Sequence, residues 1–239
     1  MEEFRIYPVA RVHLWHEPRA WPWAQANRSA IGAHLAKLRV KRPALFNGRL
    51  YLLHDWEVAD SSFKGSLFEA DFASFLAWRD AGYPDATIAH CFGMAALRTS
   101  DGVHVLGLKA AHKTRSGSID FAIGTPESRD LKPGSVVEIT PSMLRKLKQQ
   151  TGLTEDDVRL IPGWHAVVAG RRIALVKSMI MSERALAATE RIRHHISLQR
   201  PPEIADAVLV RRSTDMQLAI ADIARAFLTE VVLARRVSA

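Results

Sequence analysis

A short helix with both ends marked lies past the middle of the chain. In the segment TPSMLRKLKQQTGL, residues 140–153, Thr140 is a typical N-cap residue and Pro141 suits the first helical position. Gly152 is a natural residue for the left-handed position that follows a helix C-terminus. The apolar side chains recur at helical spacing and form one stripe, which consists of Met143, Leu144 and Leu147. The segment therefore predicts one short helix that buries a single face.

Strands and longer helices are predicted on both sides of this segment. A first strand is expected over 4–15, because the residues there favour extended structure. The turns of three later strand pairs are predicted at Asn47-Gly48, Asp101-Gly102 and Ala169-Gly170. Longer helices are predicted over 23–41, 183–200 (capped by Ser182) and 215–236. Since no repeat or linker interrupts this alternation, we expect one α/β domain with an N-terminal extension.

Composition places the chain among compact proteins rather than disordered or membrane-spanning ones. Hydrophobic residues make up 48% and charged residues 24% of the 239 residues, which is typical of a packed core. No apolar run approaches the roughly 20 residues that a membrane span needs. The first residues lack the apolar stretch of a secretory signal, and the single cysteine, Cys91, cannot form an internal disulfide. We therefore expect a cytoplasmic protein.

The chain is strongly basic, with a formal net charge of +8 and an isoelectric point near 10.0. This charge is compatible with an anionic partner, either a nucleic acid or a phosphorylated small molecule. The basic residues are spread along the chain in pairs such as Arg171-Arg172 and Arg211-Arg212, without an RNA-binding consensus or zinc-ligand spacing. A solvated surface and a nucleic-acid contact both stay open on this evidence.

The segment that contains the short helix resembles the Nudix box, whose pattern is G-x5-E-x7-R-E-U-x-E-E-x-G-U with U an aliphatic residue. Four positions match the end of the pattern, namely Arg145, Leu147, Gly152 and Leu153. Gly124, in FAIGTPE, resembles the glycine that opens it. The runs RPALFNGRLYLLHDWEV and FGMAALRTSDGVHVLGL are also similar to bacterial Nudix hydrolases. The resemblance thus covers most of the chain.

This resemblance implies a fold and a chemistry. The implied fold is a mixed-sheet α/β/α sandwich of the α+β kind, with residues 1–85 as an N-terminal extension and 86–239 as the Nudix-like domain with C-terminal helices. In the family, glutamates at i, i+3 and i+4 share one helix face and converge on Mg²⁺. The metal then activates water to split a diphosphate linkage.

The chain departs from the pattern where the metal would bind. Its three glutamate positions hold Lys146, Gln149 and Gln150, so the formal charge changes from about −3 to about +1. No metal is therefore expected on this helix. Nearby acids that could act as surrogates are Glu127 and Glu138, and we also expect Glu138 to pair with Arg145. Thr154 is expected to cap the next turn, over residues 155–157.

Three functions remain open at this stage. The first is a catalytically impaired Nudix homologue that binds a nucleotide or another phosphorylated ligand without a metal. Its candidate ligand contacts are Lys113, Arg115, Gly124 and Lys146. The second is an active hydrolase that uses Mg²⁺ or Mn²⁺ on displaced ligands such as Glu127 or Glu138. The third is a basic interaction or nucleic-acid-binding module, and a homodimer is compatible with all three.

Overall fold

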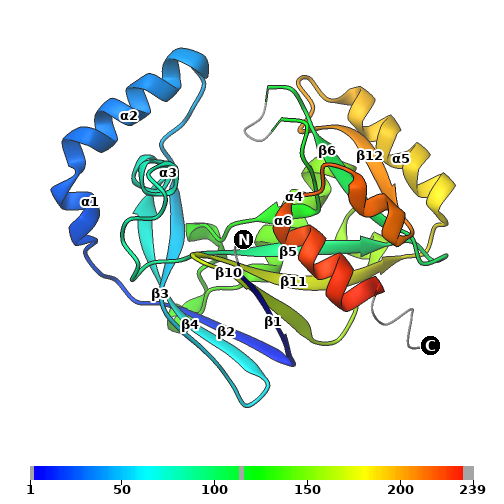
Figure 1. Cartoon of the computed structure of the whole chain (residues 1–239), viewed down its shortest axis with the longest axis horizontal. Coiled ribbons are helices and arrows are strands. Elements are labelled where there is room, and N and C mark those ends of the chain that lie inside the picture. Colours follow the sequence, from blue (N-terminus) through cyan, green and yellow to red (C-terminus); the bar gives the residue numbers. More distant parts are fainter. Residues whose placement is uncertain (1–2, 113–115, 234–239) are drawn as a thin grey trace.

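The computed structural model describes residues 3–112 and 116–233, so the candidate ligand contacts Lys113 and Arg115 lie outside the described residues. Its larger sheet has nine strands, and the main path runs β1-β10-β11-β5-β6-β12 (Figure 1). Strands β5 and β11 are parallel, whereas their neighbours are antiparallel, so the sheet is mixed. The strands of this path are β1 Phe4–Val9, β5 His90–Arg98, β6 His104–Lys109, β10 Trp164–Ala169, β11 Arg172–Met181 and β12 Ile204–Val210. The α+β class and the mixed sheet expected above are confirmed.

Three short strands extend this sheet beside the main path. Strand β7 pairs with β6, β8 with β5 and β9 with β11. They span Ile119–Asp120 for β7, Ala122–Gly124 for β8 and Val158–Leu160 for β9. Because β8 pairs with the central strand β5, it carries Gly124 into the middle of the fold.

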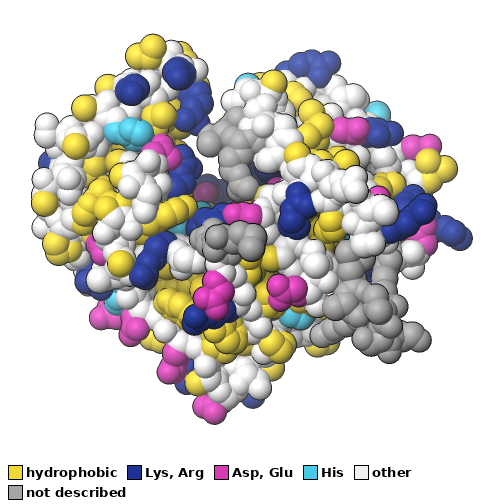
Figure 2. Space-filling view, viewed as in Figure 1, with side chains coloured by type: hydrophobic (Ala, Val, Ile, Leu, Met, Phe, Trp, Pro, Cys, Tyr) yellow, Lys and Arg dark blue, Asp and Glu magenta, His cyan; other side chains and the backbone are white. Residues whose placement is uncertain are grey.

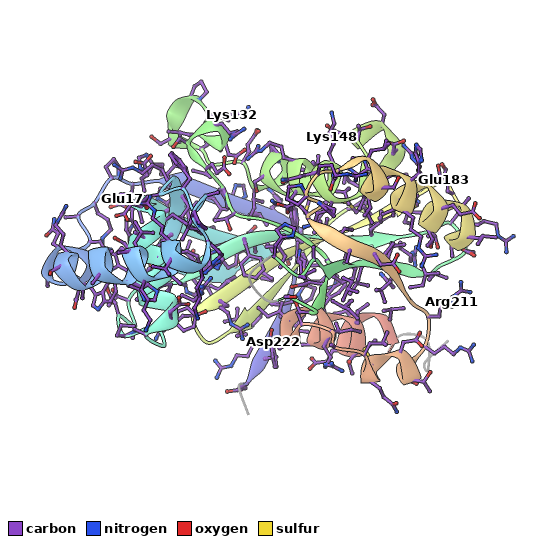
Figure 3. All side chains as sticks on the ribbon, turned by 90° about the horizontal axis from the view of Figure 1, so that it is seen from above. Glu17, Lys132, Lys148, Glu183, Arg211 and Asp222 are labelled. Atoms are coloured by element: carbon purple, nitrogen blue, oxygen red, sulfur yellow. The ribbon has the colours of Figure 1, made fainter. Side chains whose placement is uncertain are left out.

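Helices cover both faces of the larger sheet. Helix α4, Ile139–Thr151, and helix α5, Ala185–Leu198, lie on one face, and α6, Asp222–Phe227, lies on the other. Figure 3 shows this layering, with Lys148 of α4 and Asp222 of α6 on opposite sides of the sheet. Each face buries its own apolar cluster, one beneath α6 and one beneath α4 and α5.

A second, three-stranded sheet carries most of the N-terminal segment. Its order is β2-β4-β3, with β2 parallel to β4 and β3 antiparallel to β4. The elements are β2 Arg11–His16, β3 Arg49–Ala59, β4 Ser62–Asp71, α1 Pro22–Ala26, α2 Arg28–Lys41 and α3 Phe72–Asp80. One cluster of buried residues joins this sheet to the larger one, and another packs beneath α1, α2 and α3. The predicted strand over 4–15 is in fact two strands, β1 and β2, that belong to different sheets.

The turn predicted at Asn47-Gly48 is wrong, whereas the turns at Asp101-Gly102 and Ala169-Gly170 are confirmed. Strand β3 begins after Gly48 and turns into β4 at residues 60–61. Asn47 instead accepts a hydrogen bond from the backbone N–H of Ala73 at 2.7 Å through Oδ1. Asn47 and Gly48 therefore accept hydrogen bonds from the free backbone N–H groups at the start of α3. Local turn propensity cannot reveal such a contact.

Helix starts are also set by contacts that are distant in sequence. Ser182 is not the cap of α5, because the backbone N–H of Ala185 donates to Oδ1 of Asp101 at 3.0 Å. The hairpin turn between β5 and β6 thus caps a helix 84 residues away. The helix predicted over 215–236 begins only at Asp222, after a 3₁₀ turn over Ser213–Gln217.

Two further short 3₁₀ turns flank α4. One spans Ser128–Asp130 before the helix, and the other spans Glu155–Asp157 after it. Thr154 and Asp157 cap the later turn reciprocally, as predicted. A third turn, Pro133–Ser135, lies between the first of these and α4.

Among the described residues, no helix is both long enough and apolar enough to span a membrane.

Candidate functional site

Helix α4 has the position and the C-terminus that the sequence predicts. It begins at Ile139, one residue before Thr140, so Thr140 is not its N-cap. Gly152 follows its end with φ 76°, in the left-handed region, and its N–H donates to the carbonyl of Lys148 at 2.8 Å. Met143 and Leu147 are buried against the sheet. The helix therefore presents one apolar face to β5 and β8, as the resemblance implies.

Gly124 allows the close contact between β8 and α4. A Cβ atom at this position would overlap the backbone carbonyl of Ser142 in the first turns of the helix. The hydroxyl of Ser142 lies 3.2 Å from the carbonyl oxygen of Gly124 and 2.8 Å from that of Ile139, so it bridges the two elements. Gly124 is buried between strand and helix, which makes it a packing residue at the base of the site.

We predict that Gly124→Ala lowers the free energy of unfolding by about 1–3 kcal/mol, because α4 must move away from β8. Urea denaturation followed by circular dichroism measures this change. Gly32→Ala is the matched control, since a Cβ at Gly32 meets no atom within 4 Å. An equal loss of stability in both variants would contradict the packing role of Gly124.

Arg145 of α4 is anchored to a buried aspartate. Its two terminal nitrogens donate to the carboxylate of Asp130 at 2.6 and 2.7 Å. The predicted pair between Arg145 and Glu138 is wrong, because Glu138 lies exposed beside Lys132, at 3.6 Å. Asp130 is only 1% exposed and also accepts from the backbone N–H of Glu127 at 2.9 Å. The ion pair thus ties the loop after β8 to the helix.

The sequence reasoning missed Asp130, although a signal was present. Asp130 stands six residues after Gly124, which is the G-x5-E spacing of the box with aspartate in place of glutamate. Fourteen residues then separate it from Arg145, twice the seven of the pattern. Because of this longer interval, the spacing of the pattern does not single out Asp130. The two 3₁₀ turns over Ser128–Asp130 and Pro133–Ser135 lie before α4, in the segment that returns the chain to the helix.

Lys146 lies at the centre of a small polar cluster on the outer face of α4. Its Nζ donates to Oε1 of Gln149 at 2.7 Å and to Oε2 of Glu203 at 3.2 Å. The side chains of Lys146 and Glu203 are 30% and 18% exposed, so the pair is partly desolvated. Glu203 lies just before β12, 57 residues from Lys146, and the sequence reasoning did not single it out. An ion pair thus occupies the face on which the box glutamates would converge.

The remaining candidate residues do not join this cluster. Gln150 is 2% exposed and points into the protein, whereas Gln149 is exposed. Glu127 lies 2.8 Å from Arg129 and caps the turn over Ser128–Asp130. Of the predicted site residues that the structure describes, Lys146 and Gln149 meet in this cluster, and Glu203 joins them.

The donor set on α4 does not suit a divalent cation. Mg²⁺ takes oxygen ligands, usually carboxylates, and a lysine ammonium at the centre of the cluster repels it. Within residues 3–112 and 116–233, no group of three His, Cys, Asp or Glu side chains could hold a metal ion. Among the residues that the structure describes, the one carboxylate in contact with Lys146 is that of Glu203. The residues present therefore do not fit the metal that the resemblance implies.

A separate cavity of about 580 Å³ lies between α3, β5 and α6. Its aromatic wall comes from α3, the loop after α3 and β5, through Phe75, Tyr83 and Phe92. Two guanidinium groups, those of Arg79 and Arg172, also line it, together with the carboxyl groups of Asp80, Asp120 and Asp222. This volume and this mixture of aromatic and polar groups are typical of small-molecule sites.

His90 is the titratable group at the centre of this cavity wall. Its ring lies 4.6 Å from that of Phe75 and 5.0 Å from that of Phe92, and its Nε2 is 3.0 Å from Oγ1 of Thr125. Burial lowers the pKa of His90 to about 3, and the charges of Arg79 and Arg172 act in the same direction. The ring is therefore neutral at physiological pH.

The lowered pKa of His90 makes stability depend on pH on the acid side. The unfolded chain binds a proton at this residue below its ordinary pKa of about 6.5, whereas the folded chain does so only near 3. The contribution of His90 to the free energy of unfolding is therefore fully present above pH 6.5. It is lost as the pH drops from 6.5 towards 3, which lowers the free energy of unfolding by about 2–4 kcal/mol. We take a smaller loss than the full pKa difference implies, because part of the His90 ring faces the cavity and is screened by solvent.

Proton NMR of the His90 ring tests this account. We predict that its Cε1 proton keeps one chemical shift between pH 8 and pH 5. An inflection for His90 near pH 6.5 would contradict the enclosed, neutral ring.

Comparison with known proteins yields only distant structural matches. Neither a protein-family model nor a curated protein sequence matches the chain. The structure is similar to that of a Nudix hydrolase from M. Smegmatis, RenU, at 14% sequence identity, over 62% of this chain and 85% of that chain, with a TM-score of 0.39. It is also similar to the MutT protein from Methanosarcina mazei Go1, at 12% identity, over 59% and 91% of the two chains, with a TM-score of 0.37. For DR0079 from Deinococcus radiodurans the identity is 12%, the coverage 57% and 79%, and the TM-score 0.40.

Proposed function

We propose that the protein binds a nucleotide or another phosphorylated small molecule without a metal ion, and that it has lost the metal-dependent hydrolysis typical of Nudix enzymes. The helix resembling the box keeps its shape through Arg145, Leu147 and Gly152, while its metal-binding carboxylates are replaced. The proposal thus separates the scaffold, which is retained, from the metal chemistry.

The contact of Lys146 with Gln149 and Glu203 is the observation that carries this proposal. A hydrolase of this type needs several carboxylates on one helix face, because they hold the ion that activates water. Here the same face holds a lysine that is already neutralised by Glu203 at 3.2 Å. A divalent ion would have to displace this ammonium, so the helix favours a metal-free role.

The cavity beside His90 is the proposed ligand site. Aromatic rings such as Phe75 and Phe92 can stack on a planar base, and neutral His90 offers one donor or acceptor. Arg79 and Arg172 are suited to phosphate, since a guanidinium binds it with two parallel hydrogen bonds. Each arginine is held in place by an aspartate, Asp80 at 2.7 Å for Arg79 and Asp222 at 2.7 Å for Arg172. A phosphate would therefore meet pre-positioned guanidinium groups and would bind through the N–H groups that these carboxylates leave over.

Isothermal titration with nucleotide sugars and dinucleotides, with and without Mg²⁺, tests the proposal. We expect the same affinity in both conditions and no release of a mononucleotide. Phe75→Leu should weaken binding about fivefold or more, because stacking is lost. Phe72→Leu is the matched control, since Phe72 lies on the same helix and does not line the cavity. Absence of binding at millimolar ligand would overturn the proposal.

One outcome of the same experiment would favour an active hydrolase instead. This outcome is Mg²⁺-dependent release of a mononucleotide that is lost in Glu127→Gln or Glu138→Gln. Both carboxylates lie beside a basic side chain, Arg129 for Glu127 and Lys132 for Glu138, at 2.8 and 3.6 Å. They would have to leave these partners to bind a metal.

A further inference from the structure

The net charge of the chain comes almost entirely from one stretch of sequence. Residues 18–54 contain seven Lys and Arg residues and no Asp or Glu. The rest of the chain has 26 basic and 25 acidic residues and is therefore nearly neutral. Basic residues are spread along the chain, but the acidic residues that balance them elsewhere are missing here.

The structure places this stretch mainly on one helix and the loop that follows it. Helix α2 packs on α3, and residues 42–48 lead from the end of the helix back to β3 of the second sheet (Figure 1). Figure 2 shows Lys and Arg side chains gathered at the end of this helix, at the upper left of the molecule. Arg28, Lys37 and Lys41 are exposed and form no ion pair with any residue that the structure describes. Their charges therefore face solvent without a balancing carboxylate.

An exposed aromatic ring lies among these charges. Phe46, in the loop between α2 and β3, is 80% exposed, and its ring covers Gly48. The loop is attached to the helix, because Nε of Arg39 donates to the carbonyl of Leu45 at 3.1 Å. We call this surface the basic patch, and it consists of Lys37, Arg39, Lys41, Arg42 and Phe46.

We propose that the basic patch binds single-stranded nucleic acid. Lysine and arginine side chains contact the phosphate backbone and release its counterions, which provides most of the affinity. Phe46 stacks on an unpaired base, as exposed aromatic residues do in proteins that bind single strands. A duplex offers no such base, because its bases are already stacked.

The opposite side of α2 argues against a membrane as the partner. Ile31 is 6% exposed, and Leu38 packs on the cluster beneath α1, α2 and α3. A helix that lies on a membrane needs an exposed apolar face to insert between the lipids. Most of the larger apolar side chains of α2 are thus used for packing. On its exposed side, Val40 (83% exposed) is the single large apolar side chain among small, polar and basic residues, which is too little apolar surface to insert.

Fluorescence anisotropy with labelled single-stranded DNA and RNA, over a range of salt concentrations, tests the proposal. We expect the affinity to fall as salt rises, with a log–log slope of about −0.7 for each phosphate contacted. Lys37→Glu with Lys41→Glu should weaken binding about tenfold or more. The matched control is Lys148→Glu with Arg159→Glu, which makes the same charge change at exposed positions elsewhere and should alter the affinity less than about threefold.

A further variant tests the role of the aromatic ring. Phe46→Ala should weaken single-strand binding about fivefold to a hundredfold and leave duplex binding unchanged, because only stacking is removed. Equal losses in the patch and control variants would overturn the proposal. So would an absence of salt-dependent binding to either nucleic acid. Binding to vesicles that contain phosphatidylserine, lost in the Lys37→Glu, Lys41→Glu variant without any binding to oligonucleotides, would assign the patch to a membrane instead.

Discussion

Arg145→Ala is expected to lower the free energy of unfolding by about 3–5 kcal/mol. Asp130 is 1% exposed in the natural protein, and the substitution removes the guanidinium that donates two hydrogen bonds to its carboxylate. Burying a charge without a partner costs far more than removing a surface ion pair. The loop after β8 should also lose its main attachment to α4. Chemical denaturation followed by intrinsic fluorescence measures the change.

Two comparisons separate this cause from general damage to the helix. Arg191→Ala removes a more exposed arginine, which lies 2.6 Å from Asp157 and 2.9 Å from Glu183, and should cost less than about 1 kcal/mol. Adding Asp130→Asn to Arg145→Ala should recover part of the lost stability, because the orphaned charge is removed. A loss below about 1 kcal/mol in Arg145→Ala, or no recovery in the double variant, would contradict a buried anchor.

Lys146→Glu with Gln149→Glu is expected to make the stability of the chain depend on Mg²⁺. The double variant places two new carboxylates beside Glu203, because the Lys146 side chain already reaches both other residues. Without metal, repulsion among three carboxylates should lower the free energy of unfolding by about 1–3 kcal/mol. Mg²⁺ binds only the folded arrangement and should restore stability, with a rise in melting temperature of about 3 °C at ten times the dissociation constant.

Thermal unfolding in MgCl₂ and in NaCl of equal ionic strength measures this effect. The natural protein should melt at the same temperature in both salts. Adding Glu203→Gln to the double variant should remove the gain from Mg²⁺, because one of the three ligands is lost. A double variant that is indifferent to Mg²⁺ would mean that these three positions do not converge.

Capping residues and hydrophobic spacing correctly predicted those features of the fold that depend on contacts between residues close in sequence. The end of α4 is an example, because Gly152 adopts the left-handed conformation that other residues avoid. The spacing of Met143 and Leu147 likewise predicts the buried face of the helix. The turn at Asn47-Gly48 was predicted by the same kind of rule and is wrong, because both residues contact the start of α3 instead. Local propensity gave way there to a contact distant in sequence.

The candidate site was less predictable than the fold, because its contacts join distant segments. Lys146 and Gln149 can be seen in the sequence at positions where the pattern that the chain resembles has glutamates. The partner of Lys146 cannot be seen there. Glu203 lies just before β12, in a segment without a recognisable motif. It contacts Lys146 of α4 in the folded chain, in which β12 pairs with β6. The His90 cavity depends in the same way on α3 and α6, which are far apart in the chain. Spacing along one helix cannot indicate either feature.

Titration of the natural protein with Mn²⁺, followed by electron paramagnetic resonance, tests the central claim most directly. If Lys146 and Glu203 neutralise each other on α4, added Mn²⁺ stays free and its six-line signal rises in proportion to the metal added. A loss of signal that saturates at one Mn²⁺ per chain and disappears in Glu203→Gln would contradict this account, because it would place a metal ion on the helix.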